Sequence, residues 1–151
     1  MSITSQAELD ALRAIGRIVR RALDTMAAAV RPGITTAELD EIGRRVLVEH
    51  GAESAPPKVY GFPGSACISV NDEAIHGIPG DRMLRPGDLV KLDVVAEKEG
   101  FMADAAVTLG VGKVSDTADA LMRCAERALR QAAKVARVGY RLDHIGGAGG
   151  S

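Results

Sequence analysis

The sequence predicts an α+β domain in which an antiparallel sheet is flanked by helices. Apolar residues recur at helical spacing between residues 6 and 30 and again after Thr35, and each run opens with a capping-box pattern. Residues 88–109 instead alternate between apolar and polar around a short polar turn, as two paired strands do. At 151 residues, the chain has the size of one domain and can bury a core.

The first two helices have clear start and stop signals. The first is expected from about 6 to 30, where Arg31-Pro32-Gly33 ends it. The second opens at the capping box that starts with Thr35 and ends at Gly51. His50 therefore falls at a helix C-terminus, where we interpret it as a cation near the dipole and not as a ligand.

A third helix and a short internal repeat close the chain. Ser115 or Asp116 can cap this helix, whose apolar face extends to about Val138 and includes Cys124 as a small core residue. The sequence Leu-Asp-Glu-Ile-Gly of the second helix returns 103 residues later as Leu-Asp-His-Ile-Gly, after another helix and turn. We therefore expect one half-unit in residues 1–138 and the start of a second in 139–151, ending in a flexible Gly-rich tail.

Between the helices and the hairpin, residues 52–66 are rich in Pro and Gly and are predicted to be loop. The loop presents Tyr60 and Phe62, and aromatic side chains on loops either line pockets or pack on the sheet, so both roles stay open. Residues 67–71 are expected to form a strand. His76 follows between apolar neighbours, and this setting by itself favours a structural, hydrogen-bonded histidine.

Besides Asp88 at its start, the hairpin of residues 88–109 carries one aspartate within each strand, Asp93 and Asp104. With a four-residue turn that ends at Gly100, the expected register places Asp93 directly opposite Asp104. Like charges at paired positions destabilise a sheet, so the pair needs a cation, a shared proton or a nearby basic side chain. A divalent metal held between the carboxylates and an ion pair with Lys91 both satisfy this need.

Composition excludes several classes of function. A formal net charge of −1 gives no general case for binding nucleic acid or a membrane surface. Cys67 and Cys124 lack the density and spacing of a disulfide framework or a zinc knuckle. No apolar run is long enough to span a bilayer, so we expect a soluble, cytoplasmic protein.

The motifs together resemble the type I methionine aminopeptidases, metallopeptidases with a two-lobed pita-bread fold. The resemblance covers essentially the whole chain but only the first half or so of the family's domain, and it implies one half of that fold. It rests on Cys67-Ile68-Ser69-Val70-Asn71, on His76-Gly77-Ile78-Pro79, on Pro86-Gly87-Asp88, on Leu92-Asp93-Val94, and on Gly100-Phe101 followed by Asp104.

This resemblance implies an enzyme that removes N-terminal methionine from nascent proteins. Two divalent metal ions (cobalt, manganese, iron or zinc) activate water for attack on the carbonyl that follows the methionine. By the same resemblance, the roles fall to Asp93 and Asp104 as metal ligands, to His76 as the histidine that contacts the substrate, and to Cys67, Phe62 and Val59 as walls of the methionine pocket.

The sequence also departs from the family's pattern. Family members add a His and two Glu as ligands from the second half, and this chain stops before them. His144 is rejected as the missing ligand because the repeat places it at a helix start, equivalent to Glu41. Lys91 stands where Asn is common. We therefore expect weak or absent metal binding and an inactive chain unless a second chain supplies the remaining ligands.

Two alternatives from other classes stay open. The chain could be a self-associating structural module whose homodimer mimics the internal duplication. It could also be a non-catalytic pita-bread protein that binds partners, although the retention of Asp93 and Asp104 weighs against this.

Overall fold

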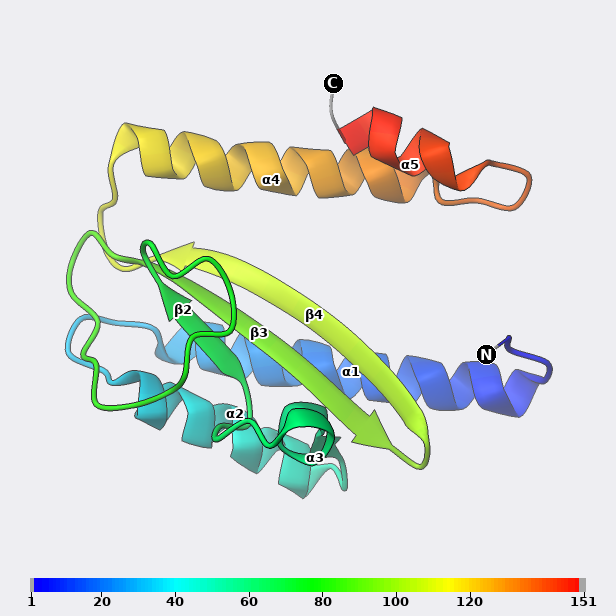
Figure 1. Ribbon diagram of the computed structural model, residues 1–151, viewed down its shortest axis with the longest axis horizontal. Helices are drawn as coiled ribbons and strands as arrows, with labels where there is room; N and C mark the ends of the chain where they lie inside the picture. Colours follow the sequence, from blue (N-terminus) through cyan, green and yellow to red (C-terminus); the bar gives the residue numbers. More distant parts are fainter. Residues whose placement is uncertain (1, 150–151) are drawn as a thin grey trace. The chain divides into compact units, whose positions relative to one another are not determined.

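The structure is a computed structural model that describes residues 2–149. It divides into two compact units, the first ending at Lys113 and the second beginning at Val114. None of the described helices is both long and apolar enough to cross a membrane. In chain order the elements are α1 (Gln6–Ala29), α2 (Thr36–Glu49), β1 (Glu53–Ser54), α3 (Ala55–Tyr60), β2 (Cys67–Val70), β3 (Leu89–Lys98), β4 (Phe101–Gly110), α4 (Asp116–Val135) and α5 (Leu142–Gly149), as labelled in Figure 1.

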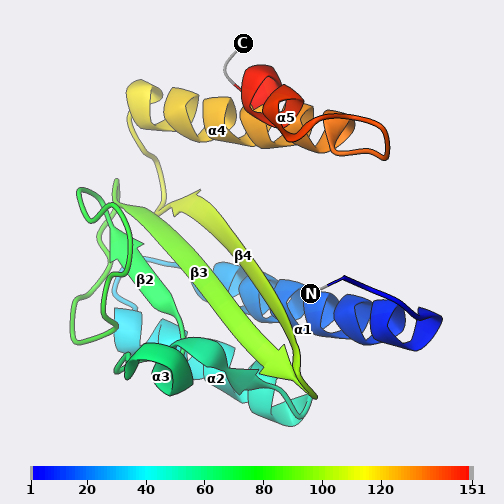
Figure 2. The ribbon, with the colours of Figure 1, turned by 45° about the vertical axis from the view of Figure 1, so that its right-hand side comes forward.

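The first unit is an antiparallel sheet with helices on one face, which confirms the predicted fold class. β3 is its central strand: β4 pairs along one edge, while β2 and the short β1 share the other edge. α1 and α2 lie on the same side of this sheet (Figures 1 and 2). β3 buries alternate residues, from Val90 to Ala96, in the common core with the helices. The intervening residues of β3 point to the opposite face.

The helix boundaries agree with the predicted caps. Ser5 accepts a hydrogen bond from the Glu8 N–H, but the Glu8 carboxylate bonds Thr4, so this capping box does not close on Ser5. The box between Thr35 and Glu38 is complete. His50 caps the C-terminus of α2, and its Nδ1 lies 2.8 Å from the carbonyl oxygen four residues earlier. The predicted position of His50 at a helix end is therefore confirmed.

The predicted hairpin exists, but its predicted register is wrong. The turn contains two residues, Glu99 and Gly100, whose φ angles of +53° and +85° are both positive, as a type I′ turn requires. Paired positions shift by two, so that Asp104 lies opposite Val95 and Asp93 lies opposite Ala106. The aspartates are therefore diagonal neighbours on one face instead of direct partners.

The prediction that residues 52–66 are all loop is also wrong, because β1 and α3 lie within them. Pro56 and Pro57 occupy the first turn of α3, where a missing N–H costs nothing, and Gly61 ends the helix with a φ of +66°. Proline in the first turn and glycine directly after the last residue is the signal of a short helix that the sequence offered. Part of the segment that was predicted to be loop is therefore the regular helix α3.

The second unit contains the α4–α5 pair, and it corrects two expectations. Ser115 caps α4 as predicted, but Cys124 is exposed and no residue of α4 is buried. The glycines from Gly146 were expected to form a flexible tail, yet α5 continues to Gly149. Because α5 packs on α4, tertiary contact offsets the low helix propensity of glycine. Residues 150–151 lie outside the described part, and the division into half-units at residues 138/139 stays a prediction.

Candidate metal and substrate site

Asp93 and Asp104 lie on the sheet face opposite α1 and α2. Asp93 is half-buried on the central strand, and Asp104 is exposed on β4. Diagonal positions on paired strands have Cα atoms roughly 7–8 Å apart, within reach of each other's side chains. Two carboxylates at this spacing can approach a common cation without displacing the backbone.

The electrostatics of Asp93 reflect this arrangement. Partial burial raises the pKa of Asp93 above its ordinary value, and the negative charge of Asp104 raises it further. Lys91 and His76 act in the opposite direction through their positive charge. A proton on Asp93 could be shared with the Asp104 carboxylate, and this too raises the pKa of Asp93. The site therefore favours the binding of positive charge, either a proton or a metal cation.

Lys91 does not form the ion pair that was the alternative to a metal. Its ammonium group donates a hydrogen bond to the carbonyl oxygen of Ala74, in the loop after β2. Within residues 2–149, no salt bridge joins Lys91 to Asp93 or Asp104. Lys91 therefore influences the carboxylates only through its field, and it leaves their oxygens free for another ligand.

Replacing Asp93 by Asn is expected to stabilise the isolated protein at neutral pH. The folded state disfavours the ionised carboxylate of Asp93, so the pKa of this group is raised on folding. The stability that the protonated form contributes is fully present at low pH and is lost as pH rises through the folded-state pKa. Removing the charge should gain about 0.2–1 kcal/mol at pH 7, the range of cross-strand pairs, and nothing well below the ordinary pKa. Urea unfolding at pH 7 and pH 3 measures this difference. A gain of equal size at both pH values would contradict the charge explanation.

Cys67 adjoins the carboxylates as the strand register dictates. It pairs with Asp93 across β2 and β3, so both side chains occupy the same face. The thiol is buried, and burial followed by the charge of Asp93 raises its pKa above the ordinary value. A neutral thiol in this position provides an apolar wall beside the carboxylates.

The segment that carries His76 is fixed to β2 by its neighbour Gly77. The Ile68 N–H donates to the Gly77 carbonyl at 2.9 Å, and the Gly77 N–H donates to the Ser69 hydroxyl at 3.0 Å. His76 itself is exposed and takes a φ of +58°, a conformation that is uncommon outside glycine. The structure thus presents the imidazole to solvent, and a positive charge on it lowers the pKa of Asp93.

The two other pocket candidates differ in their position. Phe62 is half-buried, and its ring flanks Gly64 together with Pro79, so the loop before β2 touches the segment after His76. Val59 is 61% exposed on α3. The structure therefore brings Phe62 to the same group of segments as Cys67 and His76, and it leaves Val59 on an open surface.

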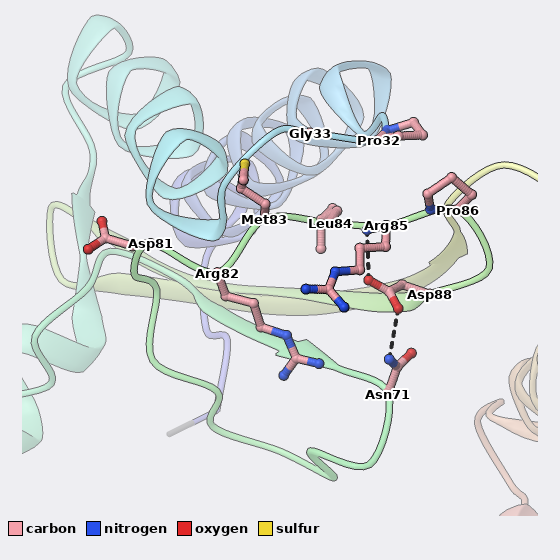
Figure 3. A pocket seen from close by; sticks show the side chains of 10 residues that line it. All are labelled: Pro32, Gly33, Asn71, Asp81, Arg82, Met83, Leu84, Arg85, Pro86 and Asp88. Carbon is pink, nitrogen blue, oxygen red and sulfur yellow. Dashed lines mark hydrogen bonds between the residues drawn. The ribbon is translucent and has the colours of Figure 1, made fainter.

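A separate hollow lies away from these residues. It has a volume of about 700 Å³, and the turn that precedes β3 forms part of its lining (Figure 3). Asp88 accepts hydrogen bonds from the Asn71 amide and the Arg85 N–H, which lower the pKa of this carboxyl below its ordinary value. These contacts tie the turn to the end of β2. None of the candidate site residues lines this hollow.

The number of candidate ligands limits what the site can hold. Within residues 2–149, no three His, Cys, Asp or Glu side chains gather in a metal-binding arrangement. The two carboxylates are oxygen donors that suit a hard divalent cation, and their mutual repulsion is relieved by one.

Comparison with known proteins places this geometry in context. The sequence matches metallopeptidase family M24 over residues 10–149. It is 45% identical to methionine aminopeptidase 2 of Bacillus subtilis over 97% of this chain and 59% of that protein. The fold superposes on methionine aminopeptidases from Rickettsia prowazekii (TM-score 0.93, 32% identity, 99% of this chain and 60% of that one) and Thermotoga maritima (TM-score 0.94, 28% identity, 98% and 60%). The chain thus spans about 60% of the length of these relatives.

Proposed function

The chain belongs to metallopeptidase family M24, and we propose that it carries part of a methionine aminopeptidase site. The observation that supports this most is the placement of Asp93 and Asp104 on the same sheet face, with Cys67 and the His76 segment beside them. The relatives from Bacillus subtilis, Rickettsia prowazekii and Thermotoga maritima are methionine aminopeptidases, which makes N-terminal methionine peptides the proposed substrates.

In this proposal, Asp93 and Asp104 hold divalent metal through their carboxylate oxygens. The metal would supply Lewis-acid chemistry that makes water nucleophilic at neutral pH. The residues of this chain provide the rest of the environment. The ammonium group of Lys91 donates its hydrogen bond to the Ala74 carbonyl, so it does not compete with a metal ion for the two carboxylates.

The substrate side of the proposal uses His76, Cys67 and Phe62. An exposed imidazole near the carboxylates can donate a hydrogen bond to a substrate carbonyl and stabilise negative charge that develops on it. The buried Cys67 and half-buried Phe62 offer apolar surface for an unbranched side chain such as that of methionine. Val59, exposed on α3, belongs to the pocket only if bound substrate reaches that helix.

Calorimetric titration with Mn²⁺ tests the metal site. We expect wild-type protein to bind weakly, with a dissociation constant on the order of 10⁻⁴–10⁻³ M, because only two carboxylates contribute. Asp104→Asn should abolish measurable binding. Asp72→Asn, which removes an exposed carboxylate from the turn after β2, should bind as wild type does. Equal binding by the Asp104 variant would defeat the assignment of the metal ligands.

An assay with a Met-Ala peptide and Mn²⁺ or Co²⁺ tests the reaction. We expect the 151-residue chain alone to show no robust turnover, since two ligands give an incomplete dinuclear site. Robust turnover that depends on Asp104 would support the assignment as an enzyme, but it would contradict the expectation that the site is incomplete. Turnover that persists in Asp104→Asn would contradict both.

A further inference from the structure

The loop that leads into Cys67 is held by side chains from two other elements. Asp40, on α2, accepts hydrogen bonds from the Ser65 N–H at 2.8 and 3.1 Å, one to each carboxylate oxygen, and from the Ala66 N–H at 2.7 Å. The hydroxyl of Ser54 donates to the Ser65 carbonyl at 2.6 Å. Both backbone groups of Ser65 are thus fixed by side chains that are distant in sequence.

The environment of Asp40 shows how much depends on this contact. The carboxylate is half-buried, whereas its helix neighbour Glu41 is directed to Arg44 and Arg45 in ordinary ion pairs. Hydrogen bonds from N–H groups to a carboxylate are about twice as strong as neutral ones. Without Asp40, the N–H groups of Ser65 and Ala66 would lose their acceptor in a partly buried place, which is costly.

The residues on either side of this anchor are the proposed pocket walls. Cys67 follows Ala66 directly and enters the sheet opposite Asp93. Phe62 precedes the anchor and flanks Gly64, which Pro79 approaches from the His76 segment. Movement of the anchored residues would therefore displace the apolar walls relative to the carboxylates, while leaving the β3–β4 hairpin in place.

We propose that Asp40 is a positioning residue for the methionine pocket. By accepting the Ser65 and Ala66 N–H groups, it fixes the wall made by Phe62 and Cys67 against the carboxylate of Asp93. The identity of the pocket rests on the proposed function, whereas the anchoring of the loop does not.

Thiol labelling tests the anchoring directly. In Asp40→Ala, the buried Cys67 should react with a thiol reagent about tenfold faster or more, the equivalent of one charge-assisted hydrogen bond. The exposed Cys124 is an internal reference, resolved by peptide mass spectrometry. In Asp40→Asn, the amide oxygen can take the place of the carboxylate oxygen that accepts the two shortest hydrogen bonds. This variant should therefore protect Cys67 from the reagent almost as well as the wild type does. Glu41→Ala is the matched control on the same helix and should label as wild type does.

Amide exchange in the wild-type protein covers the case in which Asp40→Ala does not fold. The Ser65 and Ala66 amides precede strand β2, and their protection should come from Asp40. Slow exchange of both supports the anchor. Fast exchange of both in the wild type, or unchanged labelling of Cys67 in a folded Asp40→Ala, overturns it.

Ligand binding separates positioning from a general structural role. Asp40→Ala should weaken binding of free methionine about tenfold or more, with Mn²⁺ affinity changed less than about twofold, because the carboxylates lie on the hairpin and not on the anchored loop. Asp40→Asn should rescue methionine binding. Parallel loss of both ligands would overturn the positioning role. If the wild type binds no methionine, the proposed function fails, and the labelling and exchange results still decide the anchor.

Discussion

Replacing Gly77 by Ala is expected to destabilise the first unit by about 3 kcal/mol, at the upper end of overpacking effects. A Cβ atom at this position would lie 2.3 Å from the Ile68 carbonyl oxygen and 2.7 Å from the Ser69 Cα. Both are backbone atoms of strand β2, so neither can turn away as a flexible side chain would. Relief requires the segment to leave the strand and to give up both hydrogen bonds that hold it.

The matched control for this substitution is Gly80→Ala. Gly80 lies on the same connection, but no atom lies within 4 Å of a Cβ built there. Its N–H donates to the Thr36 hydroxyl, and alanine retains that bond. We expect a change within about 0.5 kcal/mol in urea unfolding followed by circular dichroism. Similar losses in the two variants would show that the close approach of Gly77 to β2 is not what holds the segment.

The close contact between Gly77 and strand β2 explains why a glycine follows His76 in the motif. The small residue lets the backbone lie against β2, and the contact fixes the histidine at the edge of the carboxylate face. From its local sequence, His76 is a structural residue, and the resemblance to a family suggests a functional one. The structure shows an exposed side chain on an anchored backbone, an arrangement that favours contact with a ligand.

The sequence predicted those parts of the fold that depend on local signals. Caps and apolar periodicity located α1 and α2, and alternation located the hairpin. The predicted hairpin register was wrong because Glu99-Gly100 is a weaker turn signal than Asn-Gly, and a four-residue turn, 97–100, was expected instead. A shift of two residues keeps every side chain on its predicted face, whereas a shift of one would have reversed them. The aspartates thus remain together despite the error.

What the sequence could not reveal depends on contacts between distant segments. The candidate site residues were named through motif resemblance, but no pattern within α2 distinguishes Asp40 from Glu41 beside it. The difference arises only because Asp40 reaches the loop 25 residues later. Cys124 was misjudged for the related reason that an apolar stripe predicts a buried face only where another element covers it. In the described chain, Leu121 and Leu129 on α4 are 63% and 69% exposed.

Leu92→Ala is expected to cost about 2–5 kcal/mol in the free energy of unfolding. Leu92 is fully buried at the centre of β3, between Ile68 of β2 and Val107 of β4. Truncation leaves a cavity where three strands and the helices meet, and the surrounding backbone can close it only partly. Urea unfolding by circular dichroism measures the loss.

The control lies on the other face of the same strand. Val95 is half-buried beside Asp104, and Val95→Ala should cost less than about 1.5 kcal/mol. A large difference between the two variants means that the helix-covered face of the sheet supplies the stability of this unit. The opposite face can then carry two repelling carboxylates with little loss in the free energy of unfolding. Residues that serve binding and not stability can therefore occupy that face. Equal losses would mean that both faces are packed, and the carboxylates would then lie within a core and not on an open site.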